Sequence, residues 1–542
     1  MDNLPAHLHS SDASPLTTQA RLERMSEPWS ISRWIAIAVF LVVAILFGSW
    51  AANAEYDYLV LFAVWFAAAA VIVFVQDYWW APILVITAFG FSTNVGGIPL
   101  SGMELGLAIL CLALPTKMAM KTLRKAEPPM TPSFFYWALL GYVFVHAVVI
   151  IAYNHTMGVP LKNIVKSYYT AINPLIFFGL VIRYCHSRTV RPTILALFGT
   201  ILFTVLMSIF VMLTGYSLDF SEMHIQFAWL TAGGADFILR YGALYLFIFC
   251  LAYWPAARNN FGRFALGAGV AVSAFGVLLS GGRLSLATAL LAGVFFAIVR
   301  RKLWLALPFI VFGLGVATLI TIVPTALNNM PGTVQRALAP LDFSDQESQV
   351  QDELAGSDGW HQALRQRSYD YWLADLNSFY FGHGYKSWDP SLDDIDQMTE
   401  EDQDHEAQLA IEMGLTENMF SSITNIFGVV GLTLYLAFLG HLAWILLKAH
   451  NRAPLGSMSR ALCEFSLVNL AAALLFMFVL GSVPGLTLFY WTLGILGARP
   501  YLVAQKVTGA ANGAPPERPA FARPAYATGA PPATPRLQPR RV

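Results

Sequence analysis

Long apolar runs follow one another along most of the chain, with short polar connections between them. Most runs have about 17–25 residues, the length that a helix needs to cross a hydrocarbon core of ~30 Å. The pattern therefore predicts an all-α integral membrane protein with about 12–14 transmembrane helices. The expected spans lie near 34–52, 58–75, 80–93, 102–115, 134–153, 168–184, 193–214, 236–254, 264–281, 283–299, 303–323, 419–447, 461–481 and 484–498.

Two parts of this pattern need a more specific interpretation. The third and fourth runs are short, so they are either spans or re-entrant segments. The ninth and tenth form one apolar stretch that is too long for a single span. We expect the chain to turn near Ser280-Gly281-Gly282-Arg283, because two adjacent glycines supply the permissive backbone of a tight turn.

A polar, acidic segment interrupts the apolar pattern between 324 and 417. It holds nineteen Asp and Glu residues but only four basic ones. Connections are usually a handful of residues long, and much longer ones tend to carry function. We therefore expect one large loop with short helices of its own. The basic residues of this loop are Arg336, Arg365, Arg367 and Lys386.

The predicted organisation has five parts. It runs from a cytoplasmic N-terminal segment through helices 1–11, a large periplasmic loop and helices 12–14 to a disordered cytoplasmic tail, which is rich in Pro, Ala, Gly and Arg. These parts cover 1–33, 34–323, 324–417, 418–499 and 500–542.

Composition and charge support this class of protein. Only 12% of the 542 residues are charged, against about 25% in soluble domains. With fourteen spans and a cytoplasmic N-terminus, every basic loop cluster falls on the cytoplasmic side of the membrane, as the positive-inside rule requires. The net charge is zero, which gives no support to nucleic-acid binding. The four cysteines lie in or at the ends of apolar runs without metal-ligand spacing, so we expect no metal site.

Two arginines near the outer face are candidates for phosphate binding. Arg283 follows the Gly-Gly turn, where a guanidinium is suited to hold a phosphate bidentately. The alternative is an interfacial arginine that reaches the headgroups. Arg240 lies early in the eighth span, four residues after Asp236, so it is either a second phosphate ligand or the partner of that carboxylate.

The acidic loop offers a third group of candidates. Arg365 and Arg367 begin a stretch whose apolar and aromatic spacing, including Trp372, predicts an amphipathic helix on the membrane surface. The stretch ends at Phe381-Gly382-His383-Gly384-Tyr385, where the glycines indicate a tight turn.

The chain returns to the membrane at Glu417-Asn418. This pair fits an ordinary helix start, with Thr416 as the N-cap and a carboxylate in the first turn. It also fits a general base placed beside the arginines. Both interpretations remain open at the level of the sequence.

These motifs, in this order, resemble the O-antigen ligase and polymerase superfamily of bacterial membrane glycosyltransferases. The resemblance is carried by the segments that begin at Arg240, at Leu279, at Arg365 and at Glu417, and it covers about 240–438. Two features depart from the family pattern. Glycines precede Arg283 where a serine is more common, and Glu417 stands where ligases usually carry histidine.

The resemblance implies transfer of a glycan from undecaprenyl diphosphate to an acceptor sugar, without a cofactor or metal. It implies a polymerase of surface polysaccharide (exopolysaccharide, capsule or O-antigen) rather than a lipid-A-core ligase, with other polysaccharide-assembly proteins as further partners. The implied general base is Glu417, with His383 and His361 as weaker alternatives. The implied ligands of the diphosphate are four arginines: Arg240, Arg283, Arg365 and Arg367. The residues implied to lie near the acceptor are His383, Tyr385 and Asn418.

Two other classes of protein fit a chain with many spans. A transporter or flippase would carry ionisable residues in the middle of its spans and broken helices around a cavity. A non-catalytic assembly protein would use the acidic loop to bind partners. Most of the candidate charges of this chain cluster at the outer face, which favours the enzyme.

Overall fold

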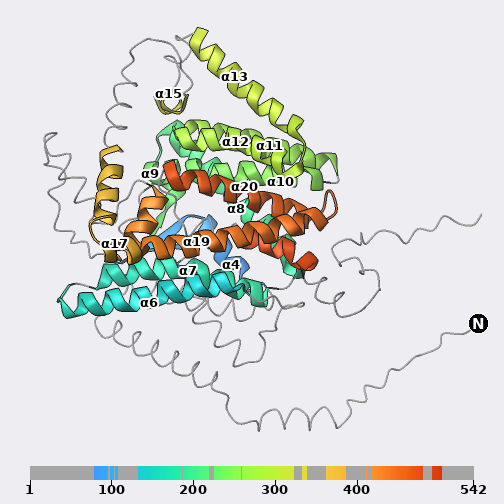
Figure 1. Ribbon diagram of the computed structural model, residues 1–542. Helices are drawn as coiled ribbons and strands as arrows, with labels where there is room; N and C mark the ends of the chain where they lie inside the picture. The colour runs from blue at the N-terminus through green and yellow to red at the C-terminus, as the bar shows by residue number, and fades with distance from the viewer. Residues whose placement is uncertain are drawn as a thin grey trace, which may run out of the picture. The chain divides into compact units, whose positions relative to one another are not determined.

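The fold was analysed in a computed structural model (Figure 1). The N-terminal segment, the first two expected spans, most of the fourth and the tail from 503 lie outside the residues that it describes. The described residues are 78–95, 98–102, 104–107, 132–159, 161–185, 187–218, 225–257, 259–322, 332–338, 362–385, 411, 418–479 and 491–502.

Eight helices within the described residues are long and apolar enough to cross a membrane, which confirms the predicted fold class. One of them combines α9 (Ala232–Phe237), a π-helical turn (Ile238–Gly242) and α10 (Ala243–Tyr253). The other seven are α6 (Phe134–Thr156), α7 (Lys162–Tyr184), α8 (Ser187–Thr214), α11 (Asn260–Leu279), α12 (Arg283–Arg300), α19 (Met419–Arg452) and α20 (Met458–Val479).

Shorter helices complete the described residues. A 3-10 turn (Leu303–Ala306) leads into α13 (Leu307–Ile322), where a span was expected. Three helical segments come from the acidic loop: α15 (Gly332–Leu338), residues 362–372 and α17 (Leu376–Phe381). Residues 491–502 are helical and overlap the last expected span.

The region near 80–93 is not a membrane-spanning helix. It contains α4 (Ala81–Ala88), followed by strands β1 (Phe91–Val95) and β2 (Ile98–Ser101) in an antiparallel hairpin. A third strand, β3 (Ile225–Phe227), pairs with the other side of β1. This small sheet is the exception to the all-α prediction, and the short helix fits the re-entrant alternative.

The helices pack in an order that brings distant parts of the chain together. α19 packs against α20 and α6, α6 packs against α7, and α10 packs against α11, α12 and α20. Figure 1 shows α19 between α20 and the α6–α7 pair. Tyr136, Phe438, Leu467 and the fully buried Trp491 belong to one hydrophobic core that joins these helices.

A buried ion cluster fixes one end of several helices. The carboxylate of Glu464 on α20 is 4% exposed and accepts from Arg300 Nη2 at 2.6 Å, His450 Nε2 at 3.0 Å and Arg460 Nε at 3.2 Å. Arg300 also donates to the Leu251 carbonyl at 3.1 Å. The C-terminal ends of α10, α12 and α19 therefore meet at this end of the bundle, and their N-terminal ends lie at the opposite end.

Candidate functional site

Arg240 lies at the N-terminal end of α10, within the π-helical turn. Such turns widen a helix locally and are frequent at functional sites. Its Nη2 donates to Asp236 Oδ2 at 2.7 Å, which confirms the alternative of a pair with that carboxylate. Its Nε is buried and has no hydrogen-bond partner, although the side chain as a whole is 42% exposed.

The Gly-Gly turn lies directly against Arg240. α11 ends at Leu279 and α12 begins at Arg283, so the chain turns where the sequence predicts. A Cβ at Gly282 would stand 3.1 Å from Arg240 Cγ, and one at Gly281, whose φ is +66°, would stand 3.0 Å from the Thr333 carbonyl oxygen of α15. The structure therefore brings the backbone before Arg283 together with Arg240 and the start of the acidic loop.

α19 is broken where it approaches the loop. Gly428 has φ 64° and ψ −171°, which separates an outer segment, Met419–Phe427, from the long helix that follows. Asn418 caps the outer segment by accepting from the Ser421 amide at 2.7 Å. The N-cap is thus Asn418 and not Thr416, while Glu417 and Thr416 lie outside the described residues.

The turn after α17 fills this break. The amide of His383 donates to the Asn425 carbonyl at 2.7 Å, and that of Gly384 donates to the Ile426 carbonyl at 3.1 Å. Gly382 and Gly428 both have positive φ, and a Cβ on either would overlap the opposing backbone. Two glycines that are distant in sequence therefore allow two backbones to touch.

The ring of His383 is held on both sides. Its Nε2 lies 2.9 Å from the Tyr371 carbonyl and its Nδ1 lies 3.4 Å from Ser378 Oγ. The ring also stacks on Tyr371, with centroids 3.9 Å apart. Both ring nitrogens thus have hydrogen-bond partners inside the loop.

α17 begins with a charged cap beside this ring. Asp375 accepts from the Ser378 amide at 2.9 Å and from the Ser378 hydroxyl at 2.6 Å. These hydrogen bonds hold the pKa of Asp375 below its ordinary value. The cap is therefore ionised at neutral pH and keeps its hydrogen bonds there.

Arg365 and Arg367 lie on helix 362–372, just before a buried residue. That residue, Ser368, accepts from Asn425 Nδ2 at 3.1 Å. Trp372 packs edge-to-face on Phe420 of the outer segment, with centroids 6.0 Å apart. This helix therefore packs on α19 and ends at 372, and its position on the membrane surface stays a prediction.

An apolar cavity of about 150 Å³ lies between α6, α7 and α19. Val143, Tyr385, Tyr435 and Trp491 are among the residues that line it. The Tyr435 hydroxyl and the Trp491 Nε1 are buried without hydrogen-bond partners. Burial raises the pKa of Tyr385 to about 12, so its phenol is neutral at physiological pH.

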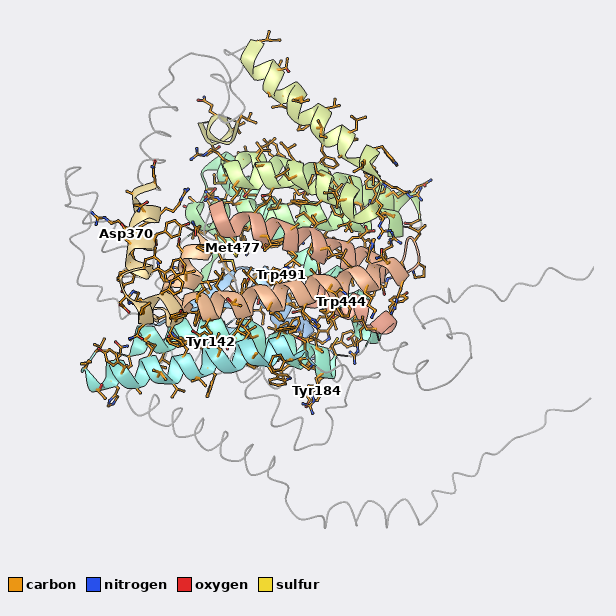
Figure 2. All side chains as sticks on the ribbon, in the orientation of Figure 1. Tyr142, Tyr184, Asp370, Trp444, Met477 and Trp491 are labelled. Carbon is orange, nitrogen blue, oxygen red and sulfur yellow. The ribbon has the colours of Figure 1, made fainter. Side chains whose placement is uncertain are left out.

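Three residues of α6 and α7 touch the same region, and the sequence did not identify them. The Tyr142 hydroxyl donates to the Phe427 carbonyl at 2.6 Å, His146 Nε2 lies 2.9 Å from the Phe381 carbonyl, and the Tyr168 hydroxyl lies 2.8 Å from His146 Nδ1. Figure 2 labels Tyr142, on α6 beside α19. Polar residues four positions apart within an apolar run, as at 142 and 146, were the available signal.

The fold and these residues define a multi-pass helical membrane protein in which Arg240 and Arg283 lie at the end opposite the Glu464 cluster. A family model described as O-antigen ligase matches residues 268–436, from α11 to α19. The matched segment contains Arg283, the acidic loop and the break at Gly428. It confirms the resemblance to the O-antigen ligase and polymerase superfamily, and it supports a membrane glycosyltransferase of this family. No curated protein matches the chain.

Proposed function

We propose that this protein transfers a glycan from undecaprenyl diphosphate to an acceptor sugar at the outer face of the bacterial inner membrane. The product is a surface polysaccharide (exopolysaccharide, capsule or O-antigen). The observation that carries the proposal is the position of the O-antigen ligase match, which covers the turn at Arg283, packed on Arg240. Among the family's reactions we favour polymerisation, because Glu417 replaces the histidine that ligases usually carry.

In this proposal the arginines bind the diphosphate. Arg283 provides fixed positive charge where the leaving group develops negative charge, which lowers the barrier without a metal. Asp236 holds Nη2 of Arg240 and thereby orients the guanidinium, whose side chain is 42% exposed and so accessible to a phosphate oxygen. Arg365 and Arg367 extend the cationic surface from helix 362–372.

The reaction exchanges one bond for another. The acceptor hydroxyl oxygen forms a bond to the anomeric carbon of the donor glycan, and the bond from that carbon to the diphosphate oxygen breaks. Glu417 takes the hydroxyl proton as general base. Undecaprenyl diphosphate leaves with its charge balanced by the arginines, while Asn418, His383 and Tyr385 lie beside the acceptor.

The lipid chain of the donor needs apolar space near the site. The cavity between α6, α7 and α19 provides apolar space beside the loop turn, and Tyr385 of this turn forms part of its wall. We place the part of the undecaprenyl chain nearest the diphosphate in this cavity. In this placement, α19 contacts both the lipid chain and the loop turn.

Separate substitution of two residues tests the proposal. Arg283→Ala and Glu417→Gln should each lower polysaccharide synthesis by about 10²–10³-fold, the usual effect of removing one preorganised electrostatic or acid–base group. Arg263→Ala is the matched control, since this exposed arginine lies near the start of α11, at the other end from the turn. Full-length polysaccharide from both variants, at normal expression, would refute the enzyme hypothesis.

The intermediates of a deletion strain separate the remaining alternatives. A pool of single lipid-linked repeats indicates a polymerase, and a pool of long lipid-linked chains indicates a ligase. A pool that faces the cytoplasm indicates a transporter or flippase. Normal intermediates with poorly assembled polysaccharide would indicate a non-catalytic assembly protein.

A further inference from the structure

The break in α19 is held from the side of the membrane domain as well as from the loop. The outer segment ends at Phe427, whose carbonyl accepts from Tyr142 of α6. α17 ends at Phe381, whose carbonyl contacts His146 one turn further along α6. A single helix therefore holds the ends of both elements that meet at the break.

Hydrogen-bond roles around His146 follow from its partners. The Phe381 carbonyl can only accept, so Nε2 of His146 carries the proton. Nδ1 is then an acceptor, and the Tyr168 hydroxyl of α7 donates to it. The ring is 8% exposed, so water does not compete for these bonds.

Aromatic rings also hold Phe427, the residue before the break. The ring of Phe427 contacts the rings of Tyr142, His146, Tyr168 and Tyr385, with centroids 5.3 to 6.5 Å apart. Tyr168 and Tyr385 also pack edge-to-face at 4.8 Å. The residue before the break is thus enclosed by rings from α6, α7 and the loop.

We propose that Tyr142, His146 and Tyr168 are positioning residues for glycan transfer. They hold the turn 382–385 on the break in α19, and so fix helix 362–372 against the outer segment that begins at Asn418. None of the three lies in the segment that matches the family model. The inference rests on the proposed function, and it makes this end of the loop a fixed wall of the site.

Hydrogen exchange tests the structural half of the proposal without any substrate. The amides of His383 and Gly384 are hydrogen-bonded to α19, so they exchange slowly in the unsubstituted protein. His146→Leu and Tyr142→Phe should accelerate exchange in the peptide that contains the His383 and Gly384 amides. His155→Leu and Tyr153→Phe are matched controls, because both residues are exposed on the same helix, and they should leave exchange unchanged. Unchanged exchange in His146→Leu would overturn the proposal.

Transfer kinetics test the functional half, with purified protein and an undecaprenyl-diphosphate-linked repeat. His146→Leu should lower kcat by about 10²-fold and Tyr142→Phe by about tenfold, with little change in the donor KM, because misplacement by about 1 Å has effects of this size. His146→Gln should restore kcat to within about threefold, since its amide can donate to Phe381 and accept from Tyr168.

Each kinetic outcome decides a distinct point. If exchange accelerates while kcat stays normal, the three residues stabilise the turn but do not position the site, and the proposed function survives. If Gln fails to restore kcat, the hydrogen bonds of His146 are not its contribution, and the proposal is wrong. If the unsubstituted protein transfers no glycan, the proposed function fails together with this inference, although exchange still reports on the turn.

Discussion

Gly428 is the residue on which the shape of the site depends most directly. Its positive φ lies in a region that L side chains rarely adopt, and it interrupts an otherwise continuous helix. A Cβ there would stand 2.2 Å from the Tyr380 carbonyl oxygen. The break, and the docking of the loop turn on it, therefore both require glycine at this position.

A pair of glycine substitutions on α19 tests this account. Gly428→Ala should lower the free energy of unfolding by about 2–3 kcal/mol, because it combines backbone strain with overlap. Gly440→Ala is the control, because its Cβ would meet nothing within 4 Å, and it should be neutral or stabilise by up to about 1 kcal/mol. Thermal unfolding in detergent measures both. Equal unfolding temperatures for Gly428→Ala and the unsubstituted protein would contradict the break.

At this scale, local sequence predicted local geometry well. The pair of Asp236 and Arg240 and the turn before Arg283 depend on neighbours within four positions, so the sequence contains their signal. The helix cap of α19 was predicted two residues early, because both Thr416 and Asn418 are good caps. The contact between His146 and Phe381 joins residues 235 positions apart, and no local pattern encodes it.

Among the elements, α12 and α20 depend on the buried ion cluster at Glu464. Its carboxylate is held by two arginines, Arg300 and Arg460, and by His450, from three helices. Removing one partner of a buried ionic group leaves the others uncompensated, which costs more than the pair contributed on formation. The cluster is thus a sensitive point of the helix packing, far from the site.

Glu464→Ala should therefore destabilise the protein by about 3 kcal/mol. The measurement is thermal or denaturant unfolding of the purified protein. Arg452→Ala, an exposed substitution at the same end of the bundle, is the control. If Glu464→Ala unfolds like this control, the cluster does not hold the helices together.

The cavity gives a second prediction at the scale of elements. Val143→Trp fills part of the cavity, so it should raise the KM for an undecaprenyl-linked donor by about tenfold, the loss expected for a few displaced methylene groups. Val148→Trp adds the same bulk to an exposed position of α6 and should leave KM unchanged. A normal KM in both variants would place the lipid chain elsewhere.

Apolar runs predicted the spans because length and hydropathy are enough to define a membrane helix. They did not predict the hairpin at 91–101, which follows a short apolar run and pairs with a strand more than a hundred residues later. Nor did they predict the break at Gly428, because glycine is common within unbroken membrane helices. Both features are fixed by contacts between elements.

At the scale of the whole molecule, the candidate site lies at one end of these helices and the Glu464 cluster lies at the other. Arg240, Arg283 and Asn418 begin helices whose other ends meet at the Glu464 cluster. The predicted orientation puts that cluster in the cytoplasm and the candidate site outside, where a translocated lipid-linked glycan is available. This orientation is predicted from loop charge alone, and labelling from outside the cell tests it.

Labelling with a membrane-impermeant thiol reagent in intact cells supplies this test. Met157, at the end of α6, is 61% exposed, so Met157→Cys should be labelled. Leu455, between α19 and α20, is 80% exposed, but Leu455→Cys should be protected until the cells are opened. The unsubstituted chain is the control for its own cysteines. The opposite pattern would reverse the orientation and remove the site from its substrate.

The most direct test of the central claim is a reconstituted transfer reaction with an undecaprenyl-diphosphate-linked glycan whose lipid carries a label. The unsubstituted protein and Arg263→Ala should release labelled undecaprenyl diphosphate as the glycan is joined to the acceptor. Arg283→Ala should release it about 10²–10³-fold more slowly. Release at an unchanged rate by Arg283→Ala, or no release by the unsubstituted protein, would contradict the account.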